Sequence, residues 1–186
     1  MGRLTHFTAH TTAQPSMVSP LSRSTPLSRR TVCTGLGCAA SAWTKNALGQ
    51  SPVFISTTLL DGQPFSTERI KGKVLLVNFW ATWCGPCRAE MPEIDAYYRQ
   101  HREQGLEVLA MSVDDLGSEV KVREVVKPFV FPVAMMKSSR LSGFGPVWRL
   151  PVSAVLDREG RLVKKDWSAE PKLDAATLDA VIKPLL

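Results

Sequence analysis

The sequence predicts an α/β domain with a mixed β-sheet, and three observations lead to this fold class. An apolar run over Val74–Trp80 is typical of a strand buried on both faces. Strand-like and helix-like segments alternate after it, which favours parallel strands joined by helices, and we expect helices on both faces of the sheet. Near the C-terminus, Val152–Leu156 and Leu162–Lys165 flank the turn Asp157–Gly160, which predicts an antiparallel pair at the end of the sheet.

Periodicity and turn residues predict the remaining elements. In chain order these are a hairpin over 54–66 around Asp61-Gly62, a helix from the cysteine motif to about 104 ended by Gly105, a strand over 106–113, a helix from about 118 ended by Pro128, a short strand over 131–135, a short helix over 138–141 and a last helix through 178–185. On the first helix, Met91, Ile94, Tyr98 and His101 are expected to share one face.

Residues 1–50 are predicted to be an export leader, followed by one domain over residues 51–186. Ser, Thr, Pro and Arg without any acidic residue make a segment that cannot bury a core. Arg29 and Arg30 precede an uncharged run over Val32–Trp43, which resembles a twin-arginine signal. This run of 12 residues is shorter than the about 20 needed to span a bilayer, and we expect no membrane span in the mature domain. The composition fits an organelle transit peptide as well, and that alternative stays open.

The leader also carries most of the charge. Of the net charge of +6, the leader contributes five basic and no acidic residues, and the rest of the chain has 18 basic and 17 acidic residues. A nucleic-acid-binding domain would need a basic body with interleaved aromatic residues. The charge pattern therefore argues against nucleic acid as a partner.

Two cysteines, Cys84 and Cys87, stand where the buried strand gives way to a helix, with Gly85 and Pro86 between them. A helix amino end concentrates free N–H groups and partial positive charge, so the pKa of the Cys84 thiol is expected to fall to about 7 or lower, as in other Cys-x-x-Cys motifs. Pro86 fits the first helical turn, where its missing N–H costs little. Cys84 is thus the predicted attacking sulfur, and Cys87, one turn further, the shielded resolving thiol of a redox-active disulfide.

Other uses of paired cysteines fit less well. Structural zinc needs four ligands, and the predicted domain offers no second cysteine pair and no clustered histidine. Cys33, Cys38, His6 and His10 lie in the leader, and His101 lies on a helix face. A copper carrier would want a wider cysteine spacing and a partnering histidine. A peroxiredoxin would place a lone cysteine after a threonine. We therefore expect no metal and no cofactor.

The motif WCGPC after an apolar strand resembles the thioredoxin-fold signature. Asn78 in VNFW and Glu90-Met91-Pro92 after the second cysteine narrow the resemblance to thiol-disulfide oxidoreductases of the TlpA/ResA type, from about Pro52 to the C-terminus. The resemblance implies a thioredoxin fold with an N-terminal β-hairpin and a central helix–strand insertion that includes 131–135.

The resemblance also implies further site residues. It makes Glu90 an active-site acid that helps Cys87 to ionise, whereas a solvent-facing helix glutamate is the alternative. It makes Leu150-Pro151 a cis-proline loop, whose exposed Leu150 backbone pairs with an extended substrate. Trp83 is expected to form an apolar rim for a client protein, whereas Trp148 fits either the rim or the core.

The predicted function is reduction of client protein disulfides by dithiol–disulfide exchange in the periplasm or cell envelope. The resemblance implies a membrane electron transporter as reductant and clients such as apocytochrome c or metal-site assembly proteins, and we expect a monomer. A disulfide-forming oxidase and a non-catalytic thioredoxin-fold metal carrier or holdase stay open as alternatives.

Overall fold

The computed structural model describes residues 53–168 and 173–186. The strands are β1 (Phe54–Thr58), β2 (Pro64–Ser66), β3 (Val74–Trp80), β4 (Leu106–Ser112), β5 (Val133–Met135), β6 (Arg140–Ser142), β7 (Val152–Leu156) and β8 (Leu162–Ser168), and the α-helices are α1 (Gly85–His101), α2 (Glu119–Val126) and α3 (Ala175–Ile182). The predicted export leader, with Cys33 and Cys38, lies outside these residues. Among the residues described, none of the helices combines the length and the apolar character that crossing a bilayer requires.

Strand β3 lies at the centre of a five-stranded sheet with the order β5-β4-β3-β7-β8. It runs parallel to β4 and antiparallel to β7, so that Asn78 pairs with Ala110 on one side and with Ser153 on the other. All seven residues of β3 are buried. The prediction of a strand covered on both faces is confirmed.

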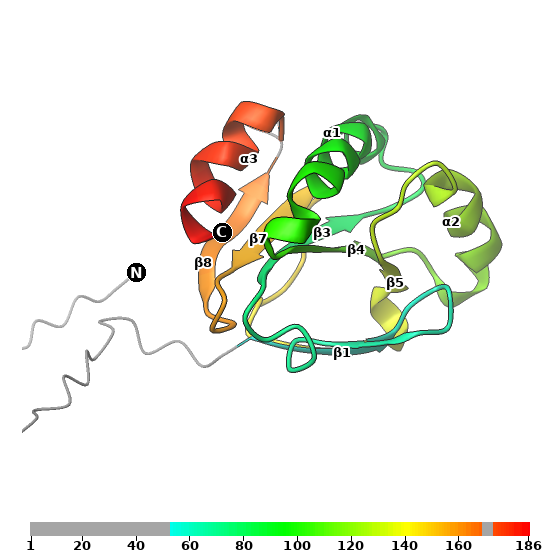
Figure 1. Cartoon of the computed structure of the whole chain (residues 1–186). Coiled ribbons are helices and arrows are strands. Elements are labelled where there is room, and N and C mark those ends of the chain that lie inside the picture. Colours follow the sequence, from blue (N-terminus) through cyan, green and yellow to red (C-terminus); the bar gives the residue numbers. More distant parts are fainter. Residues whose placement is uncertain (1–52, 169–172) are drawn as a thin grey trace, which may run out of the picture. The chain divides into compact units, whose positions relative to one another are not determined.

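Helices α1 and α3 cover one face of this sheet (Figure 1). Because successive side chains of a strand point to opposite faces, Leu76 and Trp80 of β3 contact this helix layer and join Met91 and Ile94 of α1 in one apolar cluster. Full burial of each such large side chain contributes about 1.5–3 kcal/mol. Val122 of α2 belongs to the same cluster, so α2 also packs with this layer.

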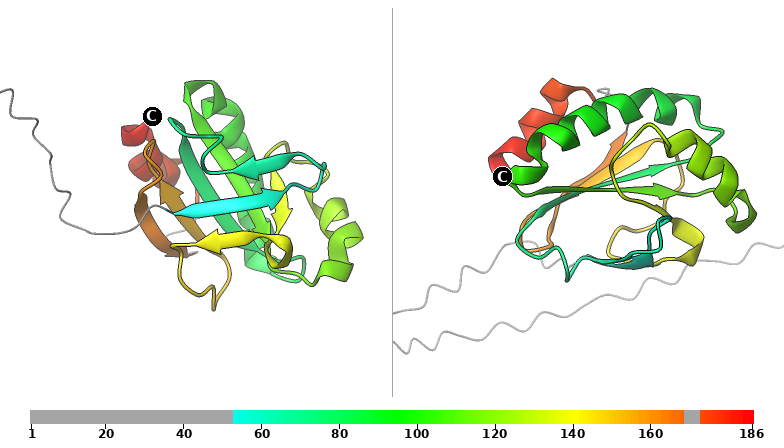
Figure 2. Two further views of the ribbon diagram at one scale, coloured as in Figure 1. Left: turned by 90° about the horizontal axis from the view of Figure 1, so that it is seen from below. Right: turned by 45° about the vertical axis from the view of Figure 1, so that its right-hand side comes forward.

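The opposite face is covered by a second sheet, β2-β1-β6, rather than by helices (Figure 2). Ile55 of β1 and Phe65 of β2 pack there against Leu75 and Val77 of β3. The predicted N-terminal hairpin is thus confirmed, and the expectation of helices on both faces is correct for one face only. The hairpin can take the place of helices because its alternating pattern supplies one apolar face.

The predicted helix over 138–141 is wrong. A single 3₁₀ turn ends at Ser138, and β6 follows and pairs with the free edge of β1, with Leu141 opposite Ile55. So short a segment cannot form the backbone hydrogen bonds of a helix within itself, whereas the edge of β1 offers hydrogen-bond partners to its backbone. At the other end of β1, the tip of the hairpin reaches β5: Leu60 N donates to Val133 O at 2.8 Å.

Helix α1 ends as predicted, with a 3₁₀ turn to Gln104 and Gly105 in the left-handed conformation at φ 100°. Its buried face includes Tyr97 rather than the predicted Tyr98, which is only partly buried. Both hydroxyls donate hydrogen bonds of 2.9 Å, Tyr97 to Asp179 of α3 and Tyr98 to Glu107 of β4. Burial first, and then these acids, raise the pKa of both tyrosines well above the usual range. The two phenols therefore remain donors that tie α1 to its neighbours.

Arg158, in the turn between β7 and β8, binds backbone carbonyls from three other segments. Its guanidinium donates to Gly72 O at 2.7 Å, to Gln104 O at 3.2 Å and to Leu185 O at 3.1 Å, and it also contacts the carbonyl of Leu186. One half-buried side chain thus joins the start of β3, the end of α1 and the C-terminal turn.

We expect Arg158→Ala to lower the free energy of unfolding by about 2 kcal/mol, because hydrogen bonds to a charged group are lost at several carbonyls together. Urea denaturation measures this change. Arg102→Ala is the matched control, since Arg102 makes an exposed ion pair with Glu103, a kind worth about 0–1 kcal/mol. Equal losses in the two variants would contradict the proposed anchoring by Arg158.

Candidate active site

Three chain segments meet at the carboxyl end of β3. Because β7 is antiparallel to β3 and Val152 pairs with Phe79, the loop that precedes β7 lies next to the turn that follows β3. The carboxyl end of β4 lies there as well, since Ser112 pairs with Trp80 in the parallel ladder. In the loop before β7, the Leu150–Pro151 peptide bond is cis, as the resemblance implied.

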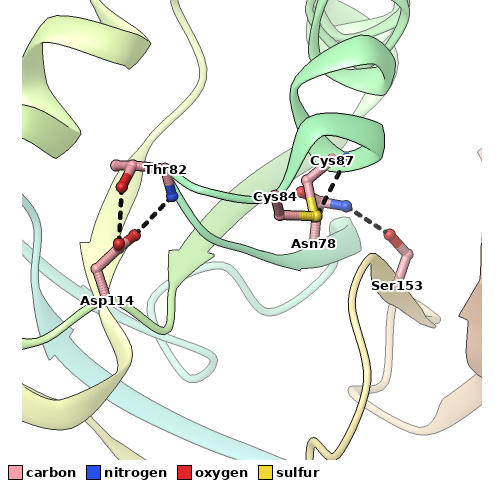
Figure 3. Close-up of a disulfide and its surroundings, with 6 residues drawn as sticks. All are labelled: Asn78, Thr82, Cys84, Cys87, Asp114 and Ser153. Carbon is pink, nitrogen blue, oxygen red and sulfur yellow. Dashed lines mark hydrogen bonds between the residues drawn. A yellow bond between two sulfur atoms is a disulfide. The ribbon is translucent and has the colours of Figure 1, made fainter.

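Cys84 and Cys87 are joined by a disulfide at this end of the sheet, with their Cα atoms 5.3 Å apart (Figure 3). Cys84 is the N-cap of α1, and its Sγ accepts a hydrogen bond from Cys87 N at 3.3 Å. Gly85 begins the helix and Pro86 stands in its first turn. The predicted position of Cys84 at a helix amino end is confirmed, and in the reduced form the free N–H groups and the helix dipole stabilise a thiolate there.

The two sulfurs differ in access. Cys87 is fully buried, whereas Cys84 is 6% exposed and lines an open surface groove of about 450 Å³. The groove is formed by Trp83, Cys84, Gly85, Pro86, Val113, Val147, Trp148, Arg149 and Leu150. A molecule lying in it can therefore meet Cys84 and not Cys87.

Two tryptophans form the exposed apolar part of this groove. Trp83 is 69% and Trp148 74% exposed, so of the two possibilities left open for Trp148, the structure excludes the core. The Arg149 guanidinium lies 4.9 Å from the centre of the Trp148 ring, within the range of a cation–π contact. Trp80, by contrast, is fully buried. Exposed tryptophans beside a reactive group are typical of surfaces that bind other proteins.

Glu90 is buried, with 2% of its surface exposed. It lies one turn after Cys87 on α1, at a spacing that puts both side chains on the same side of the helix. Burial excludes the alternative of a solvent-facing helix glutamate. Its role in proton transfer stays a prediction.

Asn78 and Ser153 form a buried hydrogen bond beneath the helix layer. Asn78 Nδ2 donates to Ser153 Oγ at 2.9 Å, and the side chain turns toward β7 (Figure 3). Asn78 Oδ1 has no hydrogen-bond partner among the residues that the structure describes. The central strand thus carries a neutral amide here, and β7 holds it in place.

Asp114, just past the end of β4, binds the turn that leads to Cys84. Its Oδ2 accepts from Thr82 N and its Oδ1 from Thr82 Oγ1, both at 2.8 Å (Figure 3). Ser112 Oγ also donates to Oδ2, at 2.8 Å. Asp114 is 5% and Thr82 3% exposed. The carboxylate therefore links the ends of β3 and β4 away from water.

This arrangement can exchange one disulfide for another. It has a sulfur at a helix N-cap, a second sulfur one turn away, an acid on the same helix and an exposed groove beside the first sulfur. Among the described residues, no three His, Cys, Asp or Glu side chains gather as they would around a metal ion.

Comparison with protein families identifies the relatives of this chain. The model of the redoxin family matches residues 47–182. The chain belongs to the redoxin family. Among curated proteins, this redoxin is similar to the thiol-disulfide oxidoreductase ResA of Bacillus cereus, with 36% identity over 118 residues, which cover 62% of this chain and 66% of that protein. ResA of Bacillus subtilis is 31% identical over 106 residues, or 56% and 58% of the two chains.

Solved structures agree with the fold. The crystal structure of a thiol:disulfide interchange protein of the thioredoxin family from Chlorobium tepidum TLS has 27% identity and a TM-score of 0.59 and covers 73% of this redoxin and 94% of that chain. The thioredoxin fold and the resemblance to the ResA type are thus confirmed. The match spans just under two thirds of the length of the first ResA relative.

Sequence reasoning predicted the cysteines, Glu90 and the cis-proline loop as site residues of this redoxin but did not single out two polar residues that lie beside them. Asp114 had a sequence signal, because Asp114-Asp115 marks the end of a strand, yet that signal indicates only a turn. Ser153 had none, since a serine in an apolar strand is not distinguished from any other. Both are assigned to the site by their hydrogen bonds alone.

Proposed function

We propose that this redoxin is a thiol-disulfide oxidoreductase that reduces disulfides of client proteins. The observation that carries the proposal is the disulfide between Cys84 and Cys87, with Cys84 at the N-cap of α1 and lining an open groove. The ResA relatives are themselves named thiol-disulfide oxidoreductases. The Gly-Pro pair between the cysteines supports the reducing direction.

In the first step the reduced protein attacks its client. The Cys84 thiolate displaces one sulfur of the client disulfide, so that a Cys84–client disulfide forms and the client's other sulfur leaves as a thiolate that takes up a proton. Attack starts from Cys84 because this sulfur lines the groove, whereas Cys87 is fully buried.

In the second step Cys87 releases the client. Glu90 takes the proton of the Cys87 thiol, and the resulting thiolate attacks Cys84 Sγ. This attack frees the second client sulfur as a thiolate, which then takes up a proton, and restores the Cys84–Cys87 disulfide. Two electrons pass in total from the protein to the client. A buried carboxyl on the same side of α1 supports this role for Glu90.

An extended client segment would lie along the groove, with its backbone paired to Leu150 as an added strand and its apolar side chains on Trp83 and Trp148. The cis Leu150–Pro151 bond and the exposure of both tryptophans support this arrangement. Trp148 thereby joins Trp83, Leu150 and Pro151 as a substrate-binding residue.

We base the proposed place of action on the composition of the leader. A basic, acid-free segment before residue 51 supports export to the periplasm or cell envelope. The oxidised pair then needs an electron donor, which we propose to be a membrane electron transporter, and apocytochrome c or metal-site assembly proteins are candidate clients. We further propose that the mature protein acts as a monomer.

Covalent trapping tests this function. Cys87→Ser is expected to accumulate a Cys84–client disulfide, because the resolving thiol is absent, and Cys84→Ser to trap nothing. Non-reducing electrophoresis followed by mass spectrometry of the captured proteins measures both. If Cys87→Ser captures no client and the reduced protein does not reduce a model disulfide, the proposed activity is refuted.

Glu90→Gln is expected to slow release of the client by about 10²-fold or more, within the range of lost general-base catalysis, while initial attack by Cys84 changes little. Stopped-flow kinetics with a disulfide peptide separate the two steps. Glu93→Gln is the control, because Glu93 lies nearly one helical turn after Glu90 on α1 and is only half-buried. Equal slowing of attack and release would contradict the proton-transfer role.

Trp148→Ala is expected to raise KM for protein clients roughly 5–30-fold, the factor that corresponds to one or two kcal/mol of lost contact, with little change in kcat. Steady-state reduction of a protein disulfide measures both constants. Val120→Ala, an exposed apolar residue of α2 outside the groove, should leave KM unchanged. A KM unaffected by Trp148→Ala would remove this residue from client binding.

A further inference from the structure

We infer that Asp114 is a positioning residue for Cys84: its carboxylate holds the turn before α1 so that the Cys84 sulfur stays at the N-cap. The inference deepens the proposed function and rests on it, because it concerns how the attacking thiol is activated. Asp114 contacts neither sulfur through a hydrogen bond, so its effect must pass through Thr82.

The contacts fix Thr82 at two atoms. Asp114 accepts both the backbone N–H and the hydroxyl of Thr82 at 2.8 Å, and Ser112 donates to the same carboxylate and accepts from Asp114 N at 3.1 Å. Two hydrogen bonds from one residue to one carboxylate define both the position and the orientation of that residue. Because Thr82 and Asp114 are both buried, water cannot readily replace the lost partner if either is changed.

Thr82 lies two residues before Cys84, in a turn closed by a hydrogen bond from Cys84 N to Ala81 O at 3.1 Å. The start of the turn is tied to β4 by Val113 N, which donates to Trp80 O at 2.9 Å. Of the three residues between Trp80 and Cys84, Ala81 is buried in the apolar cluster of the helix layer and Trp83 projects into solvent. Thr82 is therefore the residue of this turn that side-chain hydrogen bonds hold in place.

The position of this sulfur decides its reactivity. Cys84 Sγ accepts from Cys87 N at 3.3 Å, an ordinary length for a sulfur acceptor, and the field of a helix terminus falls off within its first turn. A small displacement of the turn therefore weakens the stabilisation of the thiolate. Loss of the Asp114 contacts is thus expected to raise the pKa of the Cys84 thiol.

The direction of this shift separates positioning from a direct electrostatic effect. If Asp114 acted only through a negative charge near the sulfur, replacing it by a neutral amide would favour the thiolate and lower the pKa. If it served stability alone, the pKa would stay unchanged. Only positioning predicts that the pKa rises.

The test uses the reduced full-length protein and the variants Asp114→Asn and Thr82→Val, with alkylation of Cys84 followed by peptide mass spectrometry across a range of pH. Thr82→Val keeps the carboxylate and loses one of its donors, so it carries the test even if Asp114→Asn does not fold. Arg88 and Glu90, which follow the cysteines on α1, and Arg149, which lines the groove together with Cys84, are the same in every protein.

Two variants serve as controls. Thr82→Ser retains the hydroxyl and should restore the wild-type profile. Asp95→Asn removes another buried carboxylate, which accepts from Val130 N at 2.7 Å. From the rise per residue of an α-helix, Asp95 lies about 16 Å from Cys84 along α1. This second control reports on lost stability without a change at the turn.

We expect the midpoint of alkylation to move up by roughly one pH unit in Asp114→Asn and Thr82→Val, toward the value of about 8.5 for a free thiol, and to stay in place in both controls. A lower midpoint in Asp114→Asn, an unchanged midpoint in Thr82→Val, or an equal shift in Asp95→Asn would overturn the inference. Alkylation requires no client, so this outcome is independent of the trapping experiment that tests the function itself.

Discussion

The complete burial of β3 is the constraint on which the rest of the molecule depends. A strand with apolar side chains on both faces needs two covering layers, and here helices supply one and the β2-β1-β6 sheet the other. With both faces and both edges of β3 occupied, the only direction in which the chain can leave toward solvent is past Trp80. The cysteines follow at that exit, which is why Cys84 can line the surface groove while the buried strand supports it rigidly.

This constraint also explains why the site gathers residues from distant parts of the chain. The end of β3 brings the cysteines, the end of β4 brings Asp114, and the start of β7 brings the cis-proline loop, because parallel and antiparallel neighbours of one strand present opposite ends at the same edge. The sheet register fixes these neighbours within one residue. Precision at the site is therefore a property of backbone pairing more than of the loops themselves.

Much of this could be predicted from the sequence, since the strongest signals are local. The apolar run, the WCGPC motif, Gly105 and the turn at Asp157–Gly160 each depend on nearby residues only, and each marks its element correctly. The predictions failed where residues far away in the sequence determine the local structure. Instead of the predicted helix over 138–141, residues 140–142 form a strand because they pair with the edge of β1, and no local sequence pattern reveals this distant partner. Asp114 and Ser153 likewise gain their roles only when strands far apart in sequence become neighbours.

The contact between Leu60 and Val133 has a consequence for a protein that is proposed to bind extended chains. Any open strand edge is a template on which unfolded polypeptides can add by mistake. Here the hairpin tip bridges to Ala134 and covers part of the outer side of β5, and β5 itself is only three residues long. On the opposite border of the sheet, β8 carries Lys164 and Lys165, exposed charges of the kind that discourage strand addition. With both edges of the sheet protected in this way, the backbone beside the disulfide would be the preferred site for pairing with an extended chain. The same protection would keep the protein from aggregating with its clients.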